Sequence, residues 1–275
     1  MLKALTADQV RQFDEDGCLT RLRILPADEA IALRRKLEDF ERAHPEHVGK
    51  LDFKANLLLG WIDEVSRRPV LLDIMEDLLG PDLLHWNTTF RDKPPDGRAF
   101  ADWHQDTQYI KLKPMLIICW LALSDSTIAS GCLKAVPGSH KWPLLKHAEG
   151  GDDASILSRQ QYITDDFDQT TARDLELEPG EAALINHAIV HASGANTTDD
   201  RRLGMLLDFL PTSAVKEGPR DTAMLVRGTD TFDHFDLEEQ PDPGFTEANM
   251  ERQRQALEAI TQTMYEDSSY TPKGL

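Results

Sequence analysis

The first third of the chain carries its apolar residues at helical spacing. Between residues 30 and 40 they recur every three or four positions, and charged residues fill the positions between them, which is the pattern of an amphipathic helix. A capping box at Thr6 predicts a shorter helix through Phe13. A third helix is expected over residues 69–79, just before a Gly-Pro pair. Residues 1–82 are therefore expected to form a helical lead-in.

The pattern changes at residue 83 to short apolar runs separated by Pro, Gly, Asp and Ser. Such runs are typical of strands joined by turns. The expected strands cover residues 84–91, 116–123, 132–136, 181–185 and 202–210. This part of the chain is therefore expected to be an all-β core, with helices flanking it.

The remaining segments complete a single expected domain. Residues 144–174 are polar and mixed in pattern, so we expect a long excursion that can cover a site. Helical spacing returns over residues 245–265. A chain of 275 residues is long enough for one sizeable core. We expect one domain, with its jelly-roll core over residues 83–212 and a C-terminal extension with a helix over residues 213–275.

Composition and charge argue against several classes of partner. The chain has 48 acidic and 30 basic residues, which leaves a formal charge of -18, whereas nucleic-acid binding needs a concentrated cationic surface. No apolar run approaches the length that spans a bilayer, and the first ten residues are polar. The three cysteines are too scattered for a disulfide framework. We expect a cytoplasmic protein that binds neither nucleic acid nor membrane.

His104 and Asp106 form an H-x-D pattern beyond the first expected strand. In an extended chain, residues two apart project to the same side, so the imidazole and the carboxylate converge on one point. A second histidine from a distant strand would complete the two-His-one-carboxylate face that holds non-haem Fe(II) and leaves coordination positions open. The pattern alone is weak evidence, because a surface loop often meets this spacing by chance.

His191 ends an apolar run and is followed by a tight turn and a pair of arginines. An arginine behind an iron site suits a dicarboxylate cosubstrate, because one end can chelate iron while the guanidinium takes the far carboxylate in a fork-like pair. We expect Arg202, which begins the next strand, to have this role. Arg201 is expected instead to be a solvated side chain that answers Asp199 and Asp200.

Four stretches of the chain follow one another in a characteristic order. They are Trp-His-Gln-Asp at 103–106, Trp-Leu-Ala-Leu at 120–123, the segment 131–140 with its Val-Pro-Gly-Ser-His, and the segment 191–202. In sequence, order and spacing they resemble the phytanoyl-CoA dioxygenase family, a combination more specific than any single motif. The resemblance implies a double-stranded β-helix, a jelly roll of the cupin kind. It also implies Fe(II), 2-oxoglutarate, dioxygen and a small-molecule substrate.

The resemblance implies a role for each residue that matches the family's motif. His104 and Asp106 match the proximal iron ligands, and His191 matches the distal one. Arg202 matches the residue that binds the far carboxylate of 2-oxoglutarate, and Ser193 matches a position that often assists that carboxylate. The resemblance also favours His191 over a nearby histidine as the distal ligand.

That nearby histidine is His187, which would face the same side as His191 in a continuous strand. Only His191 has the turn and the arginine at the family spacing, so His187 is expected to pack near the site. Asn87 and Thr89 lie on the strand before the metal motif, where relatives often place a polar contact to the cosubstrate. His147 has no partner at metal spacing and is expected to be a surface or hydrogen-bonded residue.

Asp106 indicates the reaction type. In halogenating relatives a small residue at this position leaves room for a halide on iron, so a carboxylate favours hydroxylation of an unactivated C–H bond, with release of succinate and CO2. Desaturation, epoxidation or cyclisation at the same iron site stays open. So does a non-catalytic cupin-type binding protein, or an iron cupin without 2-oxoglutarate. Arg202 opposes both of the last two, because neither has an evident need for it.

Overall fold

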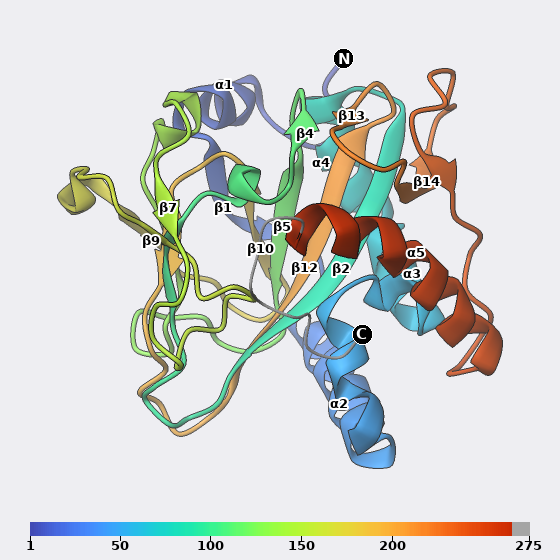
Figure 1. Cartoon of the computed structure of the whole chain (residues 1–275), viewed down its shortest axis with the longest axis horizontal. Coiled ribbons are helices and arrows are strands. Elements are labelled where there is room, and N and C mark those ends of the chain that lie inside the picture. Colours follow the sequence, from blue (N-terminus) through green and yellow to red (C-terminus); the bar gives the residue numbers. More distant parts are fainter. Residues whose placement is uncertain (266–275) are drawn as a thin grey trace.

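The computed structural model describes residues 1–265 and shows two sheets flanked by helices (Figure 1). The larger sheet has the strand order β1 (Cys18–Arg23), β10 (Glu181–Asn186), β5 (Ile117–Ala122), β12 (Arg202–Pro211), β2 (Leu83–Lys93), β14 (Thr222–Arg227) and β15 (Asp236–Leu237). The smaller sheet has the order β3 (Ala101–His104), β11 (His191–Ser193), β6 (Leu133–Ala135) and β9 (Arg173–Leu175). Two short ribbons pair β4 (Leu112–Lys113) with β13 (Val215–Lys216), and β7 (His147–Ala148) with β8 (Tyr162–Ile163). The expected jelly roll is confirmed.

The five expected strands are all present, as β2, β5, β6, β10 and β12, with shifts of one or two residues at their ends. Their pairing is antiparallel throughout, and β12 lies between β2 and β5. In Figure 1, β2 and β12 run side by side through the middle of the molecule. This pair forms the long central part of the larger sheet.

The expected helices are also confirmed, as α1 (Ala7–Asp16), α2 (Ala27–Ala43), α4 (Pro69–Leu79) and α5 (Glu247–Tyr265). Both hydrogen bonds of the capping box between Thr6 and Gln9 are present at the start of α1. The sequence pattern did not predict α3 (Gly60–Ser66) or the 3-10 segments η1 (Pro45–Asp52) and η2 (Ala55–Leu57). Segments of one or two turns carry too little periodicity to be recognised.

Strands β1, β14 and β15 lie outside the expected core of residues 83–212. The segment 1–82 was expected to be helical, yet β1 is an edge strand of the larger sheet. Its buried positions do not alternate, and its backbone is irregular at Arg21, where φ is 58°. The strand depends on its pairing with β10, in which Cys18 lies opposite Ile185. Such a long-range partner cannot be read from a local pattern.

Alternate residues of β12 separate the apolar core from the cavity of the barrel. Leu203, Met205 and Leu207 belong to the buried cluster that includes residues of α2 and α4. Arg202 and Asp208 project to the opposite side and line the cavity together with residues of the smaller sheet. The helices therefore support one face of the sheet, and the other face is available to build a site.

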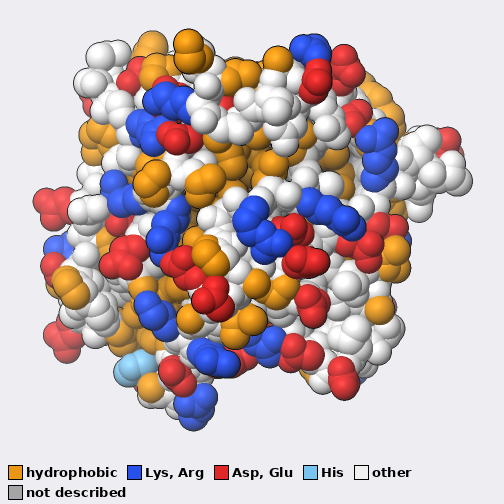
Figure 2. Space-filling model, turned by 180° about the vertical axis from the view of Figure 1, so that it is seen from behind, with side chains coloured by type: hydrophobic (Ala, Val, Ile, Leu, Met, Phe, Trp, Pro, Cys, Tyr) orange, Lys and Arg blue, Asp and Glu red, His pale blue; other side chains and the backbone are white. Residues whose placement is uncertain are grey.

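Charged side chains are intermixed over the face of the molecule shown in Figure 2, where basic and acidic groups lie beside one another. Ion pairs also join distant segments of the chain, such as Arg34 with Asp200 at 2.6 Å and Arg227 with Asp73 at 2.7 Å. Within residues 1–265, no helix combines the length and the apolar character needed to cross a membrane.

Gly204 provides the space for a large aromatic side chain in the barrel. A Cβ atom at this position would lie 2.2 Å from Cζ2 of Trp120, which is buried on the neighbouring strand β5. The indole cannot move away easily, because it is buried and Arg202 packs against its ring. Glycine is therefore the residue that lets Trp120 lie across β12 beneath the cavity.

We predict that Gly204→Ala lowers the free energy of unfolding by about 1–3 kcal/mol, because the added methyl overpacks against the Trp120 ring. Gly60→Ala is the matched control, since the nearest atom to its new Cβ is a carbonyl oxygen 3.7 Å away, and it should not destabilise the protein. Denaturant unfolding of both variants measures the difference. Equal stability of the Gly204→Ala variant and the unchanged protein would contradict this account.

Candidate metal centre

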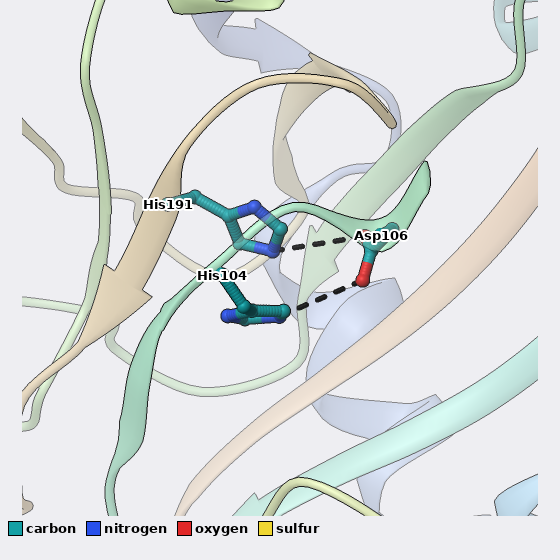
Figure 3. Close-up of side chains that lie close together, drawn as sticks. All are labelled: His104, Asp106 and His191. Atoms are coloured by element: carbon teal, nitrogen blue, oxygen red, sulfur yellow. Dashed lines mark ion pairs between the residues drawn. The ribbon is translucent and has the colours of Figure 1, made fainter. Parts of the chain in front are cut away.

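Three side chains converge at the end of the smaller sheet (Figure 3). His104 ends β3, His191 begins β11, and the two lie directly opposite each other in the antiparallel pair. Asp106 follows at the start of η3 (Asp106–Gln108), with its Oδ1 3.5 Å from His104 Nε2 and its Oδ2 3.7 Å from His191 Nε2. Ligand atoms of the three residues all lie within 4.8 Å of one another. This spacing fits one metal ion.

The backbone between His104 and Asp106 is extended, with φ -123° and ψ 128° at Gln105. The two ligands therefore project to the same side, as the H-x-D spacing predicts. Gln105 points the other way and is held by hydrogen bonds to Ala188 O and from Leu145 N, both 2.9 Å long. These bonds fix the segment that carries the two proximal ligands.

His147 also supports this segment. Its Nε2 accepts a 3.0 Å hydrogen bond from the backbone N–H of Gln105, and its Nδ1 lies 2.8 Å from Leu145 O. His147 was expected to be a surface or hydrogen-bonded residue, and the second description is the correct one. It lies on β7, in the excursion over residues 144–174, so this excursion reaches the backbone between the ligands.

Backbone carbonyls set the tautomer of both histidines. Nδ1 of His104 lies 2.7 Å from Asp102 O, and Nδ1 of His191 lies 3.0 Å from Ile189 O. Nδ1 therefore carries the proton that it donates, and the lone pair of Nε2 is left for a metal. Burial, and then the nearby His191 ring, lowers the pKa of His104 to about 3. Neutral imidazoles of this kind are the form that binds a divalent cation.

His187 is directed away from the three ligands. Its Nδ1 accepts a 3.2 Å hydrogen bond from Leu116 N, and its Nε2 lies 3.3 Å from Leu112 O. Both ring nitrogens are therefore used by the backbone, and burial lowers the pKa of the ring. This arrangement matches the packing role that the sequence favoured for His187 and leaves no lone pair for a metal.

Arg202 is buried at the far end of the cavity, with 2% of its surface exposed. Its Cζ lies 5.0 Å from the centre of the Trp120 ring. Within the described part of the chain no carboxylate pairs with it, and its Nε has no hydrogen-bond partner. Burial lowers its pKa to about 10, so the side chain remains charged. A buried guanidinium without an anion is costly, which indicates a binding site for a carboxylate.

Lys93 lies opposite Arg202 in the pairing of β2 with β12 and is fully buried. Its Nζ donates hydrogen bonds to Ser193 Oγ at 2.6 Å and to the carbonyl of Gly194. Burial, and then the charge of Arg202, lowers the pKa of Lys93 to about 6, so the amine is mostly neutral near pH 7. Because Ser193 Oγ accepts from Lys93, its own proton is free to be donated to a ligand beside Arg202.

Lys93 was not predicted from the sequence, although the alternation of polar residues along β2 pointed to it. Asn87, Thr89, Arg91 and Lys93 are polar residues at every second position of β2. This is the spacing of one strand face. Asn87 and Thr89 line the cavity as expected, but the amide of Asn87 is used within the protein, since its Nδ2 donates to Asp208 Oδ2 at 3.0 Å. Their contact with a cosubstrate stays a prediction.

The expectation for Arg201 was wrong about its partners. Its guanidinium forms ion pairs with Glu41 at 2.7 Å and with Asp92 at 2.9 Å. Asp200 is paired with Arg34 instead. Arg201 points outward, opposite to Arg202, and its carboxylate partners come from α2 and β2. Burial by a helix distant in sequence, and not the adjacent aspartates, determines its environment.

The cavity that joins these groups has a volume of about 120 Å³. It is lined by the three converging side chains, by Arg202 and Ser193, and by residues of the excursion over 144–174. Ile156, Leu157 and Gln161 are among the latter. The expected covering role of the excursion is therefore confirmed, and one cavity contains both the metal ligands and the unpaired guanidinium.

We predict that His104→Ala abolishes tight Fe(II) binding, because two ligands cannot hold the ion in this geometry. His187→Gln is the control, since its ring nitrogens contact only the backbone, and it should bind Fe(II) as the unchanged protein does. Anaerobic equilibrium dialysis with metal analysis measures both. Loss of iron from a folded His187→Gln protein, with iron retained by His104→Ala, would contradict the assignment.

Comparison with known proteins is consistent with this geometry. The sequence model of the family described as phytanoyl-CoA dioxygenase (PhyH) matches residues 7–204. A probable phytanoyl-CoA dioxygenase of Caenorhabditis elegans is 30% identical over 232 residues, which cover 72% of this chain and 73% of that protein. The family match over residues 7–204 includes both parts of the candidate metal centre.

Two solved structures share the fold. The apo structure of ThoJ, a non-haem monooxygenase, is 29% identical with a TM-score of 0.85, and the match covers 94% of this chain and 97% of that one. The structure of CytC3 with Fe(II) and alpha-ketoglutarate is 21% identical with a TM-score of 0.65, over 88% of this chain and 97% of that one, which shows a common fold. From the family match, the fold and the converging ligands, the chain belongs to the phytanoyl-CoA dioxygenase family of Fe(II)- and 2-oxoglutarate-dependent oxygenases.

Proposed function

We propose that this protein hydroxylates an unactivated C–H bond of a small molecule, with iron held by His104, Asp106 and His191. The observation that carries the proposal is the buried, unpaired guanidinium of Arg202 in the cavity that also contains these three side chains. A metal site alone serves many functions. A metal site with an anion-binding arginine behind it is suited to a chelating dicarboxylate.

The proposed ligands are prepared for a cation. Nδ1 of His104 and of His191 lies against a backbone carbonyl, which leaves Nε2 of each ring directed at the site, and Asp106 is the one carboxyl group of the set. One carboxylate and two imidazoles on one side of the ion leave its other positions free. The carboxylate of Asp106 also favours hydroxylation over halogenation, because it occupies a position that a halide would need.

Arg202 is the proposed partner of the far carboxylate of 2-oxoglutarate, and Ser193 is proposed to donate a hydrogen bond to the same group. Lys93 holds the Ser193 hydroxyl in place at 2.6 Å. Because Lys93 has a lowered pKa, Arg202 supplies most of the positive charge. Pairing with a dicarboxylate would compensate the burial of this guanidinium, so binding of the cosubstrate is favoured at this end of the cavity.

When bound, iron and 2-oxoglutarate supply the oxidising chemistry with dioxygen, and the cosubstrate leaves as succinate and CO2. The protein positions the reactants and limits their contact with water. Trp120 packs against Arg202, and Ile156 and Leu157 of the excursion close the cavity with apolar groups. These groups limit the access of water to the reacting atoms.

Two alternatives weighed from the sequence are less consistent with the site. A binding protein with a vestigial metal site has no need for three prepared ligands and a buried arginine in one cavity. An iron cupin without 2-oxoglutarate would leave Arg202 uncompensated, at a cost in stability. The presence of both features supports catalysis with the cosubstrate.

The sheet order and the cysteines bear on the domain organisation and location of the protein. We infer one domain, because the larger sheet takes strands from the lead-in, the core and the C-terminal extension. The three cysteines are buried free thiols, which fits a reducing compartment. A cytoplasmic location stays a prediction from the sequence.

We predict that Arg202→Ala raises the 2-oxoglutarate concentration needed for half-maximal succinate release by at least about thirtyfold, because truncating one partner of a buried charge pair costs about 2–5 kcal/mol. Arg201→Ala is the control, since that side chain points away and pairs with Glu41 and Asp92. It should change this concentration less than about threefold, given the small contribution of such surface pairs. Similar effects of the two substitutions would contradict the role assigned to Arg202.

A further inference from the structure

The face of β12 that lines the cavity has opposite charges at its two ends. Arg202 is at one end, opposite Lys93 of β2, and Asp208 is at the other, opposite Asn87 of β2. The two positions are six steps apart along the strand, which corresponds to about 20 Å between their Cα atoms. Both side chains line the cavity that contains the metal ligands. The cosubstrate is assigned to the Arg202 end, so the Asp208 end remains for the substrate.

Asp208 is a buried carboxyl group with few hydrogen bonds to offset the cost of its burial. Its exposed fraction is 5%, and within residues 1–265 its side chain receives one hydrogen bond, the 3.0 Å bond from Asn87 Nδ2. A carboxylate can accept several hydrogen bonds. Asn87 is itself held in place, because its Oδ1 accepts a 2.6 Å hydrogen bond from Lys54 N. The pair Asn87–Asp208 is therefore fixed, and most of the capacity of Asp208 is unused.

Within the described residues, no cation forms an ion pair with Asp208. The charged groups that face it are Asp106, Arg91 and Lys54. The amine of Lys54 is used elsewhere, by an ion pair to Glu238 at 2.6 Å and a 2.8 Å hydrogen bond to Thr222 O. Arg91 forms no ion pair with any described residue, and its effect on Asp208 is weaker than that of burial. Burial raises the pKa of Asp208 to about 7, which a cationic ligand would reverse.

The lining around Asp208 suits an organic cation. Ile118 lies beside it on β5, and the cavity is also lined by the aromatic rings of Phe53, Trp86 and Tyr109. Apolar walls bind the carbon chain that carries an ammonium group. Two of these rings already contact cations of the protein, since Lys54 Nζ lies 5.9 Å from the centre of Trp86 and Arg159 Cζ lies 4.6 Å from that of Tyr109, so Asp208 is the group that selects for the charge. An anionic substrate would instead meet a carboxyl group in a low-dielectric site, where repulsion is strong.

We propose that Asp208 is a substrate-binding residue that pairs with a positively charged amine, so that the substrates of this enzyme are amines carried on an apolar chain. This inference rests on the proposed function, which assigns the opposite end of the cavity to 2-oxoglutarate. The charge separation also keeps the two ligands apart, because Asp208 repels the dicarboxylate and Arg202 repels the amine. Asp208 thereby helps to define which end of the cavity the substrate enters.

Three probes with the same carbon chain test the proposal: n-butylammonium, n-butanol and butyrate. They are titrated calorimetrically into protein loaded with Fe(II) and 2-oxoglutarate under anaerobic conditions. We expect n-butylammonium to bind at least about tenfold more tightly than the other two, as a buried charge-assisted pair requires. In Asp208→Asn, which keeps the shape of the side chain, the preference should fall to within about twofold.

A second measurement uses the unchanged protein. Because the carboxylate form of Asp208 is needed for pairing and its pKa lies at about 7, affinity for n-butylammonium should increase as the pH rises from about 6 to about 8. The affinity of Asp208→Asn should not change in this way. n-Butanol provides the control for pH effects on the protein itself.

The results distinguish a failure of the amine-binding proposal from a failure of the proposed oxygenase function. Equal binding of n-butanol and n-butylammonium to the unchanged protein, or a preference for the amine that survives in Asp208→Asn, would overturn this inference. Asp208→Asn should bind 2-oxoglutarate at least as tightly as the unchanged protein, because a carboxylate that repels the dicarboxylate is removed, and this binding verifies that the variant is folded. Absence of 2-oxoglutarate binding in both proteins would contradict the proposed function, while the amine preference is still read from its own titration.

Discussion

The antiparallel pairing of β12 with β2 and β5 determines both which residues form the core and which residues line the site. Its register places the odd-numbered apolar residues of β12 in the core that includes the helices and places Arg202, Leu206 and Asp208 in the cavity. A slip of one residue would bury Leu203 in the cavity and expose Arg202 to the helices. The fold and the site are therefore fixed by the same register.

Buried polar groups in and around the cavity divide into two kinds. Some are fully used by the protein: both ring nitrogens of His187 contact the backbone, and the Asn87 amide holds Asp208. Others keep unused capacity, namely Nε2 of the two ligand histidines, the guanidinium of Arg202 and the carboxyl group of Asp208. The fold bears the cost of burying this second kind. Their common location in one cavity supports a reaction site that binds a metal, an anion and a substrate.

Much of the fold follows from the sequence because its elements carry strong local patterns. The helical spacing of α2 and the apolar run of β12 gave nearly correct bounds, and the i,i+2 rule placed His104 and Asp106 on one side. The edge strand β1 was missed because only its pairing with β10, distant in the chain, makes it a strand. Local pattern carries no information about such a partner.

The site was only partly predictable for a similar reason. Lys93 and Asp208 are polar residues in strands, and a polar residue in a strand usually faces solvent. Only the closure of the sheets into a barrel shows that Asp208 lines the cavity and that Lys93 is buried against Ser193. The partner of Arg201 was misjudged because Glu41 lies on α2, 160 residues away in the chain, and the local sequence around Arg201 does not show that contact. Three-dimensional neighbours determine the environment of a charge, and sequence neighbours often do not.

The central claim is that one cavity holds iron on three protein ligands and leaves room for 2-oxoglutarate to chelate it. The most direct test is an anaerobic titration of the metal-free protein with Fe(II) and then 2-oxoglutarate, followed by visible absorption. We expect a weak charge-transfer band that appears only after both Fe(II) and 2-oxoglutarate have been added. Folded protein that binds Fe(II) but gives no such band with saturating 2-oxoglutarate would contradict it.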